Sequence, residues 1–435
     1  MAGTPKSATV LAGKPVNLSR IAVWSLYALV LTLAPLVFDS SLSLTLLSQM
    51  GIAIIVCLSF NMLLGQGGML SFGHAVYSGM GAFLGIHTLN LVTDGLALPV
   101  SLIPVVAGLG SMVLALVLGW VTTHHAATPF AMITLGVGEL VWAMALMFPA
   151  FFGGEGGVSG NRVAGQAVFG ITFGPQIQLY YLIAAYTLVC TALMFAFTRT
   201  PLGCMLNAVR DNPERVAFVG YNTHMVRYLA FVLAAFFAGV SGGLAALHFE
   251  IVTAEVVSGY RSGAYLLFTF LGGATFFFGP ILGAVLMVLA FVLLSGFTQA
   301  WLLYVGLLFL VMVVHAPGGV ASLIMMNLRL AKFGFLRPLW VSYLALAATA
   351  LVALVGAATM IEMVYHLQLN AALGPELVFM GIRLNATSIN CWCGAAWVML
   401  TGLGLFELCR RQFVHDWRQI QASIERDICR QEAAL

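Results

Sequence analysis

Charged side chains are scarce in this sequence. Of its 435 residues, 8% are Asp, Glu, Lys or Arg and 61% are hydrophobic, whereas a soluble globular domain carries about 25% charged residues. The composition therefore excludes an ordinary water-soluble fold. Lysine is nearly absent, and the whole chain has only Lys6, Lys14 and Lys332. No G-x-x-x-x-G-K-[ST] motif occurs, so the chain builds no P-loop. If ATP drives this protein, another chain holds the ATP.

Sequence motifs of common enzymes are missing as well. Neither H-E-x-x-H nor G-x-S-x-G is present, which argues against the hydrolases that use those motifs. The seven cysteines have no spacing typical of a zinc site or a disulfide framework, and no basic patch for nucleic acid is found. We therefore expect no catalytic residues, no metal and no cofactor in this chain.

Long apolar runs dominate what is present. Many uncharged runs reach the roughly 17–25 residues that cross about 30 Å of hydrocarbon as a helix. The chain is predicted to be an all-α polytopic membrane protein, with about ten core transmembrane or broken helices and two extra C-terminal transmembrane helices. The predicted spans are residues 20–38, 42–64, 70–92, 97–121, 129–150, 178–198, 226–248, 263–278, 280–296, 299–315, 338–361 and 389–409. Residues 263–296 are open to three interpretations, namely two crossings, one broken helix or a re-entrant pair.

Basic residues gather in one set of loops, which the positive-inside rule places in the cytoplasm. Both termini are predicted to lie there. The glycine-rich loop 153–175 falls on the outer side. The predicted parts are a cytoplasmic tail at 1–19, a transmembrane core at 20–315, a cytoplasmic linker at 316–337, two extra helices at 338–409 and an amphipathic cytoplasmic tail at 410–435.

Two glycine-rich segments, Gly65–Ala82 and Leu271–Ala284, occupy matching places in the two halves of the first 315 residues. Paired interruptions of this kind are typical of broken helices that line a pathway. Glycine also lets helices pack closely, and both interpretations stay open. Polar groups here either face a water-filled pathway or bridge helices. The candidate pathway and gating residues are Asn61, Gln66, Ser71, His74, Glu139, Gly272 and Gly273.

Glu139 is the only carboxylate deep within a predicted span. A carboxylate inside a membrane indicates a functional site by default. It could couple transport to protons, take part in gating, or tie two helices together by a hydrogen bond. Proton coupling usually needs a second ionisable group, and no Asp, Lys or Arg lies inside any predicted span. Only His74 and His87 could supply one.

The longest polar interruption between two apolar runs is Arg199–Arg227, with the sequence RTPLGCMLNAVRDNPERVAFVGYNTHMVR. Such a segment cannot lie in hydrocarbon, so it must face water or another protein. We interpret it as a short amphipathic helix at the inner membrane face, where another subunit binds it. Movement of that subunit would then move the rest of the chain.

This stretch resembles the inner-loop signature of permease subunits of branched-chain amino-acid ABC transporters of the LivM type. The matching residues are Gly203, Ala208, Arg210, Asp211, Asn212, Ala217, Gly220, Tyr221 and Asn222. Asn61–Gly81, Phe130–Glu139 and Gly153–Gly157 resemble other motifs of the same family, so the resemblance covers about residues 40–325. Cys204 departs from the basic residue usual after this glycine. The two spans and the tail after residue 337 are extra.

The resemblance implies a mechanism and a set of partners. A second, LivH-like permease would complete the pathway, two cytoplasmic ATPase subunits would bind the inner loops, and a periplasmic or lipid-anchored binding protein would deliver the amino acid. ATP and Mg²⁺ would belong to the ATPase subunits. The residues implied to contact an ATPase subunit are Gly203, Arg210, Asp211, Asn212, Glu214, Arg215 and Gly220.

Other functions stay open from the sequence. Close relatives of the family carry urea or short amides, so branched-chain or similar hydrophobic amino acids are an expectation only. A self-contained secondary transporter or channel is a different class, against which the lack of intramembrane charge pairs argues. A scaffold whose extra C-terminal spans recruit a partner is a third.

Overall fold

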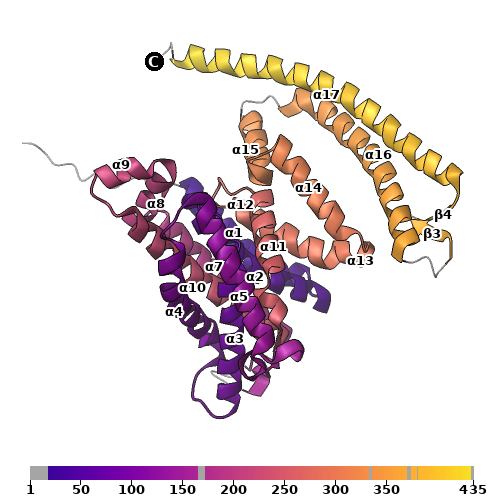
Figure 1. The fold of residues 1–435 in the computed structure, drawn as a ribbon. Helices are drawn as coiled ribbons and strands as arrows, with labels where there is room; N and C mark the ends of the chain where they lie inside the picture. The colour runs from indigo at the N-terminus through magenta and orange to yellow at the C-terminus, as the bar shows by residue number, and fades with distance from the viewer. Residues whose placement is uncertain (1–17, 165–171, 333–335, 370–373, 380, 433–435) are drawn as a thin grey trace, which may run out of the picture.

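A computed structural model describes residues 18–164, 172–332, 336–369, 374–379 and 381–432. Figure 1 shows a bundle of helices with a long C-terminal helical hairpin beside it. Among the described residues, nine helices are long and apolar enough to cross a membrane, or ten if the bent pair Trp301–His315 and Gly319–Leu328 counts as one span. The predicted all-α polytopic architecture is confirmed.

The bundle is built from helices of very different lengths. Its helices are α1 (Leu18–Val37), α2 (Ser41–Asn61), α3 (His74–Thr93), α4 (Ile103–Thr122), α5 (Ala127–Met147), α6 (Pro149–Phe152), α7 (Gln176–Phe197), α8 (Pro201–Asp211), α9 (Pro213–Phe218), α10 (Thr223–Phe249), α11 (Gly259–Gly272), α12 (Gly279–Val288), α13 (Ser295–Phe297), α14 (Trp301–His315) and α15 (Gly319–Lys332). The π-helical segments η1 (Met62–Gln66) and η6 (Leu289–Leu294) extend α2 and α12, and the 3₁₀ turn η5 (Ala254–Val257) precedes α11.

Within the described residues, four short strands form two antiparallel pairs. β1 (Val158–Ser159) pairs with β2 (Ile251–Val252), which joins the loop after α6 to the end of α10. β3 (Glu376–Phe379) pairs with β4 (Ile382–Asn385) at the tip of the C-terminal hairpin, which consists of α16 (Leu336–Leu369) and α17 (Ile389–Glu432).

Local chemistry sets several helix boundaries. The Ser40 side chain caps α2 by accepting a hydrogen bond from Ser43 N, and the Ser258 side chain caps α11 by accepting one from Arg261 N. Pro201 and Pro213 occupy the first turns of α8 and α9, where a missing N–H leaves no helical hydrogen bond unmade. These signals end one helix and start the next within a few residues.

The most buried span of the described chain is α10, which packs against α2, α3 and α4. Its contact with α3 depends on glycine. A Cβ atom at Gly242 would lie 1.8 Å from the Ser78 carbonyl oxygen, and one at Gly81 would lie 2.5 Å from the Gly239 carbonyl oxygen. The two backbones therefore touch, as small residues allow in membrane helix pairs.

The predicted apolar runs each correspond to a helix, but not each to a full crossing. α11 has 14 residues, which is about 21 Å at 1.5 Å per residue and short of the roughly 30 Å of hydrocarbon. The chain leaves β2 at one end of the bundle, and η5 then packs on Gly79 within α3. Residues 263–296 therefore contain the end of a helix that is too short to cross the membrane by itself, followed by the apolar span Gly279–Phe297.

The C-terminal hairpin stands largely apart from the bundle. Only 6% and 11% of the apolar windows of α16 and α17 are buried. Tyr304 Oη donates a 3.1 Å hydrogen bond to Glu362 Oε1, and the Thr298 hydroxyl donates to the same oxygen. α17 runs unbroken for 44 residues, so the predicted span 389–409 and the tail helix are one element. The expectation that Glu139 is the only carboxylate inside a span was wrong, because α16 continues past residue 361 and includes Glu362.

We expect Gly242→Val to lower the melting temperature of the detergent-purified protein by several degrees, because overpacking a tight contact costs about 1–3 kcal/mol and the added side chain would strike Ser78 O and Ala82 N. A thermal scan followed by size-exclusion chromatography measures this. Gly136→Val is the matched control, since nothing lies within 4 Å of a Cβ there. Equal melting temperatures for the two variants would contradict the backbone contact.

Candidate functional site

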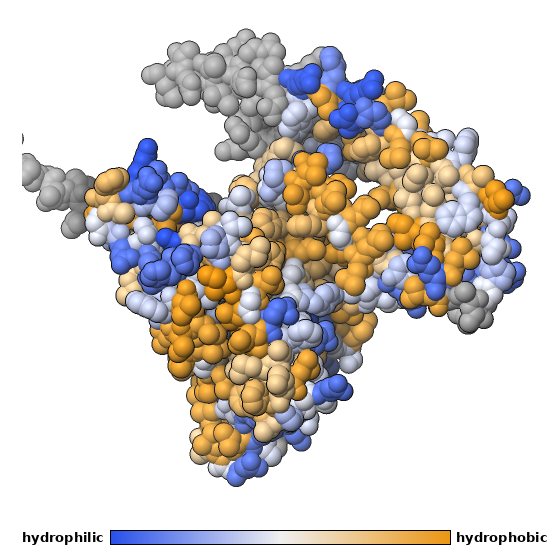
Figure 2. Space-filling model, viewed as in Figure 1, coloured by the Kyte–Doolittle hydropathy of each residue, from blue (hydrophilic) through white to orange (hydrophobic). Residues whose placement is uncertain are grey.

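The polar stretch predicted to lie at the membrane face forms a pair of short helices, α8 and α9. The Thr200 hydroxyl caps α8 by accepting a 3.2 Å hydrogen bond from Gly203 N, and the Asn212 side chain caps α9 through Arg215 N at 3.0 Å. Leu206, Val209 and Val216 are buried against the bundle. Figure 2 shows hydrophilic residues gathered over these helices, above a mostly apolar surface. The pair is thus amphipathic and docked on the bundle's end.

The residues expected to contact a partner lie in three different settings. Gly203 is buried, and a Cβ there would lie 2.3 Å from the Phe197 carbonyl oxygen, so it is a packing residue and offers no surface. Asn212 is occupied as a helix cap, and Gly220 holds the turn after α9 at φ +95°. Arg210, Asp211, Glu214 and Arg215 are exposed.

Arg210 joins the polar helices to the first glycine-rich segment. Its Nη1 donates to the carbonyl oxygen of Gly65, and its stem lies against Gly68. Its Nη2 also pairs with Asp211 Oδ1 at 2.9 Å. One turn earlier on α8, Asn207 Nδ2 donates a 2.8 Å hydrogen bond to Gln66 Oε1. We call these two contacts from Arg210 and Asn207 to η1 the latch.

The two glycine-rich segments meet beside the latch. A Cβ atom at Gly65 would lie 2.2 Å from the Ala274 carbonyl oxygen, in the turn between α11 and α12. In the same turn, the backbone of Gly272 packs against that of Gly279. Gly273 has a φ of +112°, and its backbone packs against that of Gly318. α2, the α11–α12 turn and the break between α14 and α15 therefore meet at one junction of backbones. The matched placement predicted from the sequence brings these segments together in space.

The other candidate pathway residues are buried near this junction. His74 Nε2 lies 2.9 Å from Ser59 Oγ, and its ring packs on the edge of Phe60, which favours a packing role. Asn61 Oδ1, Ser71 Oγ and His74 Nδ1 have no hydrogen-bond partner among the described residues. Gln66 bridges two elements, since it belongs to the latch.

Glu139 is exposed on α5 and ties no helices together. Its carboxylate makes no hydrogen bond or ion pair within the described part of the chain, and its Oε1 lies 2.8 Å from the Cβ position of Gly259, at the start of α11. The position of this carboxylate is that of a surface group at a helix break, and the gating and proton-coupling interpretations stay open.

The sequence analysis missed two sets of residues. The first is an exposed apolar tip after α9, which we define as Phe218, Val219 and Tyr221, with 89%, 75% and 48% of their surfaces exposed. The signal was an apolar run that continues past α9 in an otherwise polar stretch. The second is Arg261, which lies in the first turn of α11, whereas the predicted span began at residue 263. Ser258, five residues before that predicted span, caps this helix and could have indicated the earlier start.

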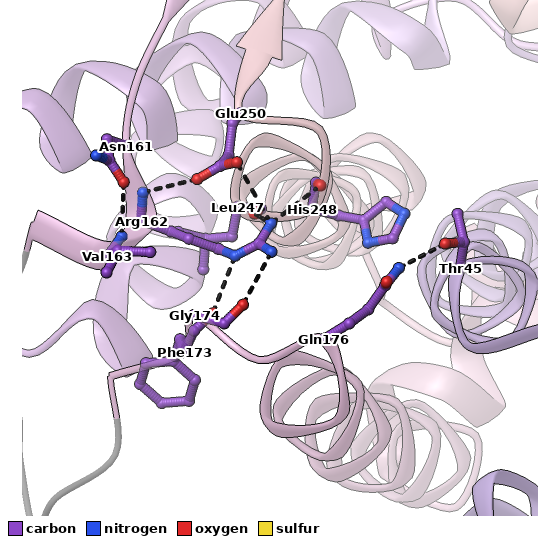
Figure 3. Close-up of polar contacts among 10 residues, drawn as sticks. All are labelled: Thr45, Asn161, Arg162, Val163, Phe173, Gly174, Gln176, Leu247, His248 and Glu250. Atoms are coloured by element: carbon purple, nitrogen blue, oxygen red, sulfur yellow. Dashed lines mark hydrogen bonds and ion pairs between the residues drawn. The ribbon is translucent and has the colours of Figure 1, made fainter. Parts of the chain in front are cut away.

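A separate polar network fixes the other end of the bundle. Figure 3 shows Arg162 reaching from the loop after β1 toward the end of α10. Its guanidinium donates to the carbonyl oxygens of Phe173, Gly174, Leu247 and His248, and it forms a 3.6 Å ion pair with Glu250. The loop is thereby held next to β2, the strand that leads into η5 and α11. Residues 165–171 of this loop lie outside the described residues.

Comparisons with known proteins identify the family of the chain. A family model described as "Branched-chain amino acid transport system / permease component" matches residues 42–317. The high-affinity branched-chain amino acid transport system permease protein LivM of Escherichia coli (strain K12) is 26% identical over 300 residues, which cover 64% of this chain and 70% of the relative. The protein of the same name from Salmonella typhimurium (strain LT2) is 27% identical with the same coverage. No solved structure matches.

We expect Arg210→Ala to raise amide hydrogen exchange across residues 65–69 about fivefold or more, because losing a hydrogen bond worth about 1–1.5 kcal/mol frees η1 from α8. Exchange followed by mass spectrometry of the protein in lipid nanodiscs measures this. Arg215→Ala is the control, since that side chain is exposed and makes no hydrogen bond or ion pair in the described chain. If both variants exchange like the parent, the latch does not restrain η1.

Proposed function

The chain belongs to the family of permease components of branched-chain amino-acid transport systems, because the family model covers residues 42–317, and from this premise we propose how it is driven. It is a multi-pass membrane subunit of an ABC importer for branched-chain amino acids. In the proposal, α8 and α9 receive a separate ATPase subunit, and the latch passes the resulting movement into the bundle.

The exposed apolar tip carries this proposal. Phe218 is 89% exposed beside charged neighbours on a helix pair that is otherwise polar on its outer side. Exposed aromatic residues with a charged surround are typical of anchors in protein interfaces. The charges of Arg210, Asp211, Glu214 and Arg215 would form the polar rim of such an interface, and the N-terminus of α9 adds its dipole.

The latch explains how docking would reach the transport pathway. Arg210 and Asn207 bind the backbone and side chain of η1, and η1 touches the α11–α12 turn through Gly65. Because these contacts are direct, a displacement of α8 must either break them or carry η1 with it. Closure of ATP-bound partner subunits would thus move the junction without any nucleotide chemistry in this chain.

The remaining partners and the orientation follow from the same proposal. ATP hydrolysis resides in two cytoplasmic ATPase subunits, which hold the ATP and Mg²⁺. A LivH-like second permease completes the pathway, and a periplasmic or lipid-anchored binding protein delivers the amino acid. The chain lies in a bacterial inner membrane with α8, α9 and both termini facing the cytoplasm, as the basic loops favour.

We expect Phe218→Ala to weaken binding of the purified ATPase subunits to the nanodisc-embedded protein about tenfold, since truncating an aromatic anchor costs about 1–2 kcal/mol or more. Biolayer interferometry measures the dissociation constant. Phe297→Ala is the matched control, because that residue is 85% exposed at the far end of the Gly279–Phe297 span.

Two results would overturn the proposal. One is unchanged ATPase-subunit binding in Phe218→Ala together with Glu214→Lys, because both the anchor and the rim would then be irrelevant. The other is leucine uptake driven by an ion gradient in vesicles that contain this chain alone, because a self-contained transporter would need no ATPase subunit.

A further inference from the structure

A partly open cavity of about 230 Å³ lies in the bundle, lined by α2, α3, α10, β2, η5, α11 and the span formed by α12 and η6. This volume is below the roughly 300–1,000 Å³ of pockets for drug-sized ligands, and it suits a molecule as small as one amino acid. Most of the wall is apolar. The apolar lining includes Ile52, Ala53, Val56, Ala246, Met287, Val288 and Phe291.

Arg261 brings a positive charge to this apolar cavity. It is half-buried, it lines the cavity, and its guanidinium carbon lies 5.9 Å from the centre of the Phe291 ring. Within the described parts of the chain, its guanidinium has no hydrogen-bond acceptor and no carboxylate within 4.0 Å. A charge inside a membrane protein is costly unless it is paired. An anionic group of a ligand would supply the negatively charged partner that the described chain does not give Arg261.

Two further polar groups line the same cavity without a partner. The Gln49 carboxamide and the Tyr265 hydroxyl make no hydrogen bond with the rest of the described chain. Gln49 lies on α2, whereas Arg261 and Tyr265 are one turn apart on α11. The cavity thus combines a cation and a neutral acceptor on α11, a second neutral acceptor on α2, and mostly apolar walls.

We propose that this cavity binds the transported amino acid during its passage, with the carboxylate on Arg261, the ammonium group on Gln49 or Tyr265, and the branched side chain against Val56, Met287 and Phe291. The inference rests on the proposed function and adds a binding site and its determinants to it. A carboxylate forms bidentate, charge-assisted hydrogen bonds with a guanidinium, which the neutral walls cannot replace. The aliphatic walls exclude water and favour a branched apolar side chain.

The surrounding geometry connects this site to the junction, so that a movement there could release the bound molecule. Arg261 lies in the first turn of α11, and the far end of this short helix is Gly272, at the junction beside the latch. Phe291 lies in the π-helical η6, a kind of distortion that is frequent at functional sites. A movement of the junction would therefore tilt the helix that carries the carboxylate-binding charge.

A photoactivatable leucine analogue that carries a diazirine tests the proposal in the complete complex, reconstituted with its ATPase, second permease and binding-protein partners. We expect the analogue to label cavity residues on α2, α10 or η6 in the parent. Excess leucine should suppress the labelling, and leucinamide, which lacks the carboxylate, should not. Labelling should fall roughly tenfold or more in Arg261→Gln, partly recover in Arg261→Lys, and stay unchanged in the control Arg383→Gln, an exposed arginine of β4.

A second variant leaves the arginine in place. Ala245→Phe fills the cavity from α10 and should abolish labelling while the complex still elutes intact from a size-exclusion column. Equal labelling in Arg261→Gln and the parent, equal competition by leucinamide, or labelling outside the cavity would each overturn the proposal. ATP-driven leucine uptake distinguishes failure of the proposed function from failure of the cavity proposal. If the parent complex fails to take up leucine, the proposed function is wrong. Normal uptake and labelling in Arg261→Gln would contradict only the proposal that this cavity binds the amino acid.

Discussion

Backbone groups that a helix break releases inside an apolar medium must find partners within the protein. In this structure, side chains from other helices of the same chain make hydrogen bonds with the backbone groups at the helix breaks. After η1, the Thr134 hydroxyl accepts from Phe72 N at 3.1 Å, and the Ser262 hydroxyl accepts from Ala75 N at 3.0 Å. Before this break, the Gly65 carbonyl is taken by Arg210. The interrupted helices therefore depend on α5, α11 and α8 for their hydrogen bonds, and none of these elements can move independently of the break.

This dependence involves two kinds of contact. α3, α4 and α10 touch backbone to backbone at glycines, and around η1 and the α11–α12 turn the backbones also touch, at Gly65, Gly272 and Gly273. The latch between α8 and η1 consists instead of side-chain hydrogen bonds. Hydrogen bonds can be exchanged during a movement, whereas an interdigitated crossing cannot be repacked cheaply. The contact between α8 and η1 is therefore the one that can change without repacking the bundle.

Hydropathy was enough to predict the helices but not how far each one extends across the membrane. Every predicted apolar run became a helix, because a run without charge has no other stable form in a membrane. The length of α11 was hidden, since a short apolar helix inside the bundle and an apolar crossing have the same composition. Arg261 was left outside the predicted span 263–278, although it lies in the first turn of α11. The sequence also indicated that the stretch around Arg210 is amphipathic, but the partners of Asn207 and the burial of Gly203 depend on how distant segments pack, which no local pattern records.

The C-terminal hairpin has a consequence that is separate from transport. α16 has 34 residues, so its axis is about 51 Å long at 1.5 Å per residue, well beyond a hydrocarbon layer of roughly 30 Å. An apolar helix longer than the local bilayer tilts, or the bilayer around it thickens. The hairpin is joined to the bundle at Glu362 and through the 2.9 Å hydrogen bond from Tyr343 Oη to Asn327 Oδ1 on α15. Few residues of its apolar windows are buried, so membrane thickness would act on its inclination together with these contacts. The lipid composition of the host would thereby influence how this appendage stands beside the permease.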